Sequence, residues 1–79
     1  MKNHNTAFGD TLRALRKRRH LTQEMLAFES GLDRTYISLL ELGSRSPTLD
    51  TITTLCDALG VSLSSLAQRV EEAMQDKGT

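Results

Sequence analysis

Apolar residues in this chain recur at every third or fourth position, in five segments separated by short breaks. That spacing puts side chains on one face of an α-helix, whereas a half-buried strand needs strict alternation, which no segment shows. Ser, Thr, Asp or Asn precedes each segment and Gly follows three of them, as expected at helix starts and ends. The sequence therefore predicts an all-α fold of five helices.

The expected domain covers residues 7–76, with a flexible arm at residues 1–6 and a flexible tail at residues 77–79. Asn5 or Thr6 is the expected cap of the first helix, and the later caps are Thr22, Asp33, Thr48 and Ser62. A chain of 79 residues buries only about 60% of its unfolded surface, so oligomerisation is a common source of additional stability.

Charge is distributed unevenly although the formal net charge is zero. Residues 1–45 hold eight Lys and Arg against five acids, giving +3, and residues 46–79 hold two against five, giving −3. Lys17, Arg18 and Arg19 are expected to act through a long-range field that speeds encounter with an anionic partner rather than through direct contacts. The apolar runs are too short for a membrane span.

Metal binding and catalysis find no support in the sequence. His4 and His20 have no Cys or His partner at ligand spacing, so we expect no metal. Cys56 lies on an apolar helix face and is expected to be a buried core thiol. No nucleophile–base pair, phosphate-cradling glycine loop or carboxylate pair is present, so an enzyme is not expected.

The second and third helices have the spacing of a helix-turn-helix. Counting from Gln23, Ala27 is fifth, Gly31 ninth, Ile37 fifteenth and Leu40 eighteenth. A small residue allows the two helices to cross closely, glycine makes the turn, and the two aliphatic residues hold the second helix on the core. The motif covers about residues 23–42.

Beyond this spacing, the stretch LTQEMLAFESGLDRTYISLLELGSRSPTLDTITTLCDALGVSL resembles the Cro/phage-repressor-like, or xenobiotic-response-element, helix-turn-helix family. With FGDTLRALRKRR as the first helix, the resemblance covers roughly residues 7–66. The phrase LDRTYIS is also similar to controller proteins of restriction–modification systems. The resemblance implies a compact, lambda-repressor-like DNA-binding domain of five helices that works as a homodimer on inverted-repeat operators.

The second helix of such a motif enters the major groove, and the first lies across the DNA backbone. We expect eight residues to contact DNA: Thr22, Gln23, Arg34, Thr35, Tyr36, Ser38, Leu39 and Arg45. Arg34 is the first choice for base recognition, because a guanidinium can donate two hydrogen bonds to guanine. Leu39 is placed to contact a thymine methyl group, while Gln23 and Arg45 suit phosphates. Tyr36 is expected to be half-buried with its hydroxyl near a phosphate.

Two further sets of residues have expected structural roles. The resemblance pairs the positions of Arg16 and Glu41, which implies a partly buried ion pair that fixes the angle of the recognition helix. The apolar stripe of the fifth helix extends beyond what the core of one chain requires. It predicts a homodimer interface formed by Leu66, Ala67, Val70 and Met74.

We therefore expect a cytoplasmic, sequence-specific transcriptional regulator that binds double-stranded operator DNA as a homodimer, without a cofactor, a small-molecule effector or a membrane partner. One alternative within this class is a restriction–modification controller that both activates and represses. Another is a protein–protein interaction module, such as an antitoxin on the same fold, in which exposed leucines including Leu39 and Leu42 would contact a protein. Salt-dependent binding to duplex DNA distinguishes these alternatives.

Overall fold

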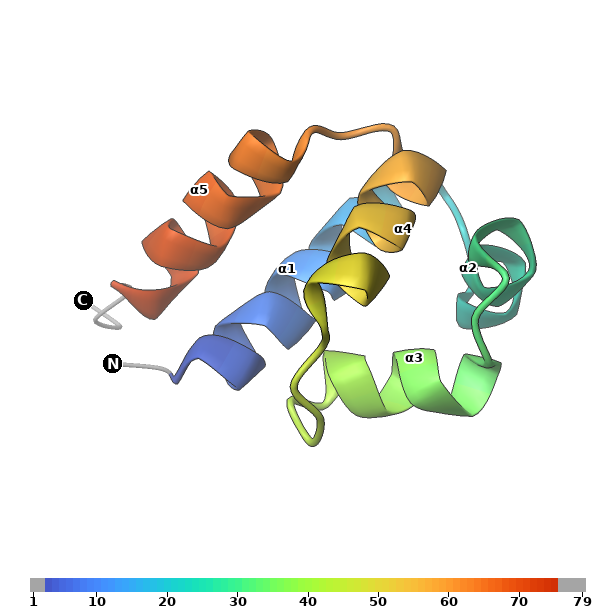
Figure 1. Ribbon diagram of the computed structural model, residues 1–79, viewed down its shortest axis with the longest axis horizontal. Helices are drawn as coiled ribbons and strands as arrows, with labels where there is room; N and C mark the ends of the chain where they lie inside the picture. Colours follow the sequence, from blue (N-terminus) through green and yellow to red (C-terminus); the bar gives the residue numbers. More distant parts are fainter. Residues whose placement is uncertain (1–2, 76–79) are drawn as a thin grey trace.

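The computed structural model describes residues 3–75. Within them, five helices follow one another without a strand, which confirms the predicted all-α fold. The helices are α1 (His4–Arg18), α2 (Gln23–Ser30), α3 (Arg34–Glu41), α4 (Leu49–Leu59) and α5 (Leu63–Met74). Helix α1 lies behind α4 and alongside α5, whereas α2 and α3 form the opposite end of the molecule (Figure 1).

Side-chain caps begin four of the helices. The Thr22 hydroxyl accepts a hydrogen bond from the Met25 N–H at 3.0 Å, and Thr48 and Ser62 cap α4 and α5 in the same way. Each cap satisfies one of the N–H groups that a helix start leaves unpaired. Asp33 stands at the predicted cap position of α3, but its side chain makes no capping hydrogen bond.

The start of α1 differs from the prediction. The cap is Asn3, whose Oδ1 accepts a hydrogen bond from the Thr6 N–H at 2.8 Å, rather than Asn5 or Thr6. Residues 4–6 are therefore helical, and the folded domain begins before residue 7, where the sequence placed its boundary. The sequence offered several polar residues in a row, and only packing selects one of them as the cap. Residues 1–2 and the predicted tail at 77–79 lie outside the described residues.

The core forms among all five helices, with α1 packed against both α3 and α5. The largest side chains that are completely buried there are Leu12, Leu26, Ile37, Leu40 and Leu55. Gly9 allows α1 and α3 to approach closely, because a Cβ at this position would lie 2.5 Å from the Leu40 carbonyl oxygen. This contact fixes the recognition helix against the rest of the domain.

Cys56 is buried, with 3% of its surface exposed, as expected for a core thiol. Burial, followed by the nearby charge of Asp57, raises the pKa of its thiol. Across residues 3–75, no group of three or more His, Cys, Asp and Glu side chains is arranged to hold a metal ion. None of the helices in that range combines the length and the apolar character that a membrane span requires.

Candidate nucleic-acid interface

Helices α2 and α3 are joined by residues 31–33 and form the predicted helix-turn-helix. Gly31 turns the chain with φ of 73°, a left-handed conformation that favours glycine. Ala27 is buried between the helices, and Ile37 and Leu40 are completely buried beneath α3. All of these positions have the structural roles that the motif spacing predicts.

The opposite face of α3 is open to solvent. Arg34 and Thr35 are exposed, and Ser38 and Leu39 are half-buried. Leu42, at the end of the helix, has 64% of its surface exposed. The structure thus leaves the predicted base-contacting side chains accessible on one face of α3.

Four of the predicted DNA contacts meet in a single cleft of about 180 Å³ between the start of α2 and the exposed face of α3. The cleft is lined by Gln23, Arg34, Thr35 and Ser38. Thr22 and Arg34 also line the adjoining cleft around the N-terminus of α2. The unpaired N–H groups and partial positive charge of a helix N-terminus attract anions, so this end of α2 suits a phosphate.

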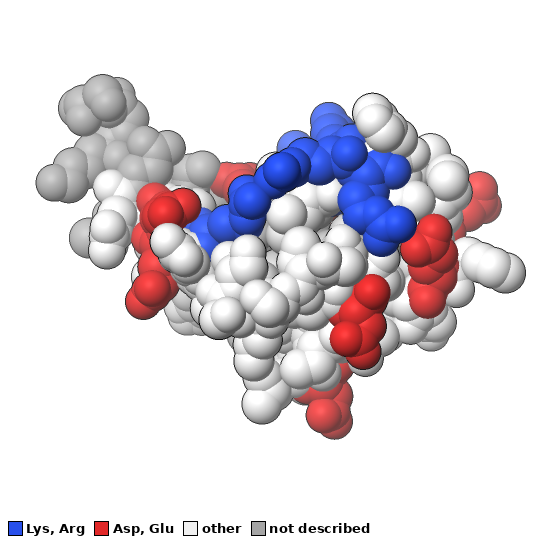
Figure 2. Space-filling model, turned by 90° about the horizontal axis from the view of Figure 1, so that it is seen from above, with Lys and Arg blue, Asp and Glu red and all other residues white. Residues whose placement is uncertain are grey.

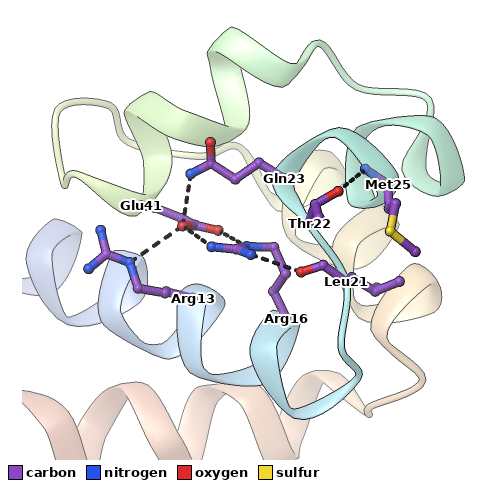
Figure 3. A network of polar contacts seen from close by, with 7 residues as sticks. All are labelled: Arg13, Arg16, Leu21, Thr22, Gln23, Met25 and Glu41. Carbon is purple, nitrogen blue, oxygen red and sulfur yellow. Dashed lines mark hydrogen bonds and ion pairs between the residues drawn. The ribbon is translucent and has the colours of Figure 1, made fainter.

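A buried carboxylate holds the interface together from behind (Figure 3). The Arg16 Nε donates to Glu41 Oε2 at 2.6 Å, and Arg16 Nη2 donates to Glu41 Oε1 at 3.0 Å. A third guanidinium nitrogen, Nη1, donates to the Leu21 carbonyl oxygen at 2.8 Å. Arg16 and Glu41 thus form the ion pair that the resemblance implies, but it is fully rather than partly buried, with 8% and 3% of their surfaces exposed.

The charges of this pair are mutually stabilised. Burial by itself would raise the pKa of Glu41, but the hydrogen bonds from Arg16 and Gln23, the charge of Arg16 and the contact with Arg13 together hold that pKa below its usual value. The hydrogen bond to Glu41 likewise raises the pKa of Arg16 against the opposing effect of burial. Both groups are therefore charged at neutral pH.

Gln23 links this pair to the surface. Its Nε2 donates to Glu41 Oε1 at 3.0 Å, a contact that the sequence did not reveal. Because a side-chain amide carries two N–H bonds, the contact with Glu41 orients the amide and leaves its second N–H for another acceptor. The Thr22 hydroxyl caps α2 and so has a structural role besides its predicted contact with DNA.

Tyr36 and Arg45, two other predicted DNA contacts, do not line this cleft. Tyr36 is half-buried and packs against the core, and Arg45 is exposed in the loop between α3 and α4. Sequence reasoning missed Arg13, whose Nε lies 3.5 Å from Glu41 Oε1. Its position three residues before Arg16 is the signal that could have indicated it, since residues three apart share a helix face.

The predicted dimer interface stays a prediction, but its residues differ in burial. Leu66 has only 2% of its surface exposed and belongs to the core of its own chain, because α5 lies directly on α1, although it also lines the groove described below. Ala67 is exposed, and Val70 and Met74 are half-buried. Ala67 and Val70 border an apolar groove of about 330 Å³ together with residues of α1, α4 and the loop before α4.

A model of the helix-turn-helix family matches residues 12–66, which include both helices of the motif and the buried ion pair. The chain belongs to this helix-turn-helix family. The control protein C.BamHI of Bacillus amyloliquefaciens is 47% identical over 55 residues, 68% of each protein. The predicted similarity to restriction–modification controllers is therefore confirmed.

Solved structures of two controller proteins share the fold of this helix-turn-helix chain. The restriction–modification controller protein C.AhdI from Aeromonas hydrophila has 44% identity and a TM-score of 0.75, covering 77% of this chain and 92% of its own. The controller protein C.Esp1396I, solved as a tetramer in complex with its natural 35 base-pair operator, has 28% identity and a TM-score of 0.87. That match covers 96% of this chain and all of the other.

Proposed function

We propose that this chain is a homodimeric transcriptional regulator that binds an inverted-repeat operator with α3 in the major groove. The observation that carries the proposal is the cleft between α2 and α3, where Gln23, Arg34, Thr35 and Ser38 converge. One wall offers phosphate donors at a helix N-terminus, and the other offers side chains that can reach base edges. Such a protein acts in the cytoplasm, where bacterial DNA lies.

A second copy of this chain is the proposed occupant of the apolar groove between α1, α4 and α5. Leu49 and Leu63, with 64% and 43% of their surfaces exposed, lie at the first positions of α4 and α5, and Leu63 lines the groove. A partner subunit that covered this groove would bury Leu63 together with the rest of its apolar lining.

Restriction–modification control is the favoured form of this regulation. It is supported by the 47% identity to C.BamHI and by the two solved controller structures. We expect such a controller both to activate and to repress its operon.

Selection of bound sequences from random duplex DNA, followed by a footprint, tests the proposed function. We expect an inverted repeat with half-site centres about 34 Å apart, one turn of the double helix. A family of selected sequences without two-fold symmetry would contradict the homodimer. Binding that did not weaken with salt would instead favour a protein partner on the leucine-bearing face of α3.

Two arginine variants then test the division between base and phosphate contacts. Arg34→Ala should weaken operator binding by about 1–3 kcal/mol and relax specificity mainly at one base pair. Arg45→Ala should weaken all sequences about equally and lower the salt slope by roughly one. If Arg34→Ala weakened specific and non-specific DNA alike, Arg34 would belong with the phosphate contacts.

A further inference from the structure

Arg13 carries a positive charge that the buried ion pair does not require. Arg16 alone donates two hydrogen bonds to the Glu41 carboxylate, at 2.6 Å and 3.0 Å, and so neutralises its charge. The Nε of Arg13 lies 3.5 Å from Glu41 Oε1, further than in a good N–H···O hydrogen bond, and its side chain is 45% exposed. These three residues bring together two positive charges and one negative charge, and an anion from outside the domain can balance the excess.

The exposed end of Arg13 lies beside the Gln23 amide. Gln23 Nε2 and Arg13 Nε approach the same atom, Glu41 Oε1, at 3.0 Å and 3.5 Å, so the two nitrogens can be no further apart than these two contacts combined. Figure 3 shows the terminal nitrogens of Arg13 directed away from the carboxylate. A guanidinium has five N–H donors and a side-chain amide has two, so both groups keep donors that Glu41 does not occupy.

This pair of donors adjoins the site that we assign to the operator. Gln23 lines the cleft between α2 and α3. Glu41 is buried, with 3% of its surface exposed, so a phosphate at the Gln23 amide meets the donors rather than the carboxylate. Such a phosphate would have the Arg13 guanidinium within reach, and arginine commonly donates two parallel N–H bonds to a phosphate.

We propose that Arg13 binds the same backbone phosphate of the operator as Gln23, with Glu41 as the positioning residue for both. Arg13 thereby adds a phosphate contact from α1 to the contacts from α2 and α3, once in each subunit of the dimer. The contact fixes the orientation of the domain on the DNA but reads no base. This inference rests on the proposed operator binding.

Operators that carry one uncharged methylphosphonate test this contact. Each phosphate is replaced in turn, and binding by the wild type, R13Q and Q23A is measured between about 50 mM and 200 mM salt. R13Q should bind the unmodified operator about tenfold more weakly. Because each phosphate contact contributes about 0.9 to the salt slope of log K, and a dimer makes this contact twice, the slope should fall by about 2. Methylphosphonate at one phosphate should weaken the wild type more than it weakens R13Q or Q23A.

R18Q is the matched control, because it removes the same charge from an exposed residue of α1. Arg18 follows Arg13 by five residues, which is about 140° around the helix axis. Figure 2 shows Lys and Arg side chains in a band across the face that is uppermost in Figure 1, so losing any cation slightly weakens a long-range attraction for DNA. R18Q should change operator binding by less than about twofold and keep the wild-type pattern of methylphosphonate effects.

The effects at single phosphates separate a direct contact from a role in the fold alone. If R13Q kept the wild-type salt slope, or the wild-type loss at every methylphosphonate, Arg13 would only support Glu41 and the contact would be overturned. Reduced effects at different phosphates in R13Q and Q23A would overturn the shared phosphate. If R13Q did not fold, R13K would decide: its single ammonium should reduce the effect at that phosphate alone, and an unchanged effect would overturn the contact. A wild type that binds no operator would count against the proposed function instead.

Discussion

Glu41 joins three helices through a single carboxylate. Arg16 of α1 and Gln23 of α2 donate to it, and Arg13 lies at ion-pair distance (Figure 3). A buried charge without a partner is costly, so each member of this cluster depends on the others. The amide that we assign to a DNA phosphate is therefore held in place by an ion pair in the core.

Arg16→Met should destabilise the fold by about 3–5 kcal/mol, because it leaves Glu41 buried without its main partner. Arg18→Met changes an exposed residue of the same helix and should cost less than about 0.5 kcal/mol. Urea unfolding of both variants at neutral pH measures the difference. Equal midpoints would show that the pair contributes little to stability.

The lowered pKa of Glu41 predicts a loss of stability in acid. Because the pKa is lower in the folded state, the contribution of the carboxylate is complete above its usual value of 4.5 and declines as the pH falls through the folded pKa. Urea midpoints of the wild type between about pH 3 and pH 7 should decline at the acid end. Glu41→Gln should be less stable at neutral pH and should show a shallower acid decline. A parallel decline in both proteins would assign the effect to other carboxylates.

His20 carries backbone strain at the end of α1. Its φ is 59°, the one positive value among the described residues other than glycine. Its N–H and that of Leu21 bond to the Lys17 and Arg16 carbonyls, a helix-ending motif that favours glycine at this position. His20→Gly should relieve backbone strain of about 1–3 kcal/mol in the folded state. Glycine also has more conformational freedom in the unfolded chain, which should lower the stability by about 0.4–1 kcal/mol.

We therefore expect His20→Gly to raise the free energy of unfolding by roughly 1 kcal/mol, and by no more than about 2.5 kcal/mol. His20→Ala removes the same side chain without relieving the backbone, so it is the matched control and should give no gain. Thermal and urea unfolding measure both variants. A gain in the alanine variant would point to the imidazole rather than to the backbone.

At the scale of elements, the contact between α1 and α3 sets the position of the recognition helix. A Cβ at Gly9 would lie 2.5 Å from the Leu40 carbonyl oxygen and 2.6 Å from that of Glu41. Both atoms belong to the backbone of α3, so the helix itself would have to move. The same contact lies directly behind the face that we assign to DNA.

Gly9→Ala should lower the free energy of unfolding by about 3 kcal/mol or more, although alanine favours a helix by about 1 kcal/mol over glycine. Gly31→Ala is the comparison, because its Cβ would meet open space and only the positive φ opposes it, at about 1–2 kcal/mol. Unfolding in urea compares the two. If Gly9→Ala lowered the stability less than Gly31→Ala, α1 and α3 would be able to move apart at little energetic cost.

At the scale of the whole molecule, the groove between α1, α4 and α5 is the surface that one chain leaves incomplete. Its lining is mostly apolar and includes Phe8, Ile52 and Leu63 from three different helices. A domain of 79 residues has a small hydrophobic core, so burying this groove in a dimer would add directly to its stability. The interface that we propose is therefore wider than the α5 stripe that the sequence indicated.

Leu63→Asp with Ala67→Asp should give a folded monomer with weakened operator binding. Both side chains line the groove, and each substitution places a charge where the second copy would pack. Ser64→Asp adds a charge to the same turn on an exposed residue that does not line the groove, so this control should remain a dimer. Analytical ultracentrifugation measures the oligomeric state. A monomeric wild type at micromolar concentration that still bound the operator tightly would contradict the interface.

The sequence by itself determined the helices and the motif. Apolar spacing and capping residues are local signals, and the predicted caps placed the starts of α2, α3, α4 and α5 correctly. The spacing from Gln23 to Leu40 likewise predicted which face of α3 is buried. The resemblance implied the pair of Arg16 and Glu41, but the residues between them carry no signal of that contact.

Only the tertiary structure decided which polar groups meet. The bond from Gln23 to Glu41, the reach of Arg19 to α4 and the burial of Leu66 all join residues on different helices. Helical periodicity gives the direction of a side chain about its own axis, but not the angle at which another helix crosses it. For the same reason the basic run at the end of α1 could be counted in the sequence, while the packing of the helices decided that Arg16 is buried against Glu41 and that Lys17 and Arg18 stay exposed.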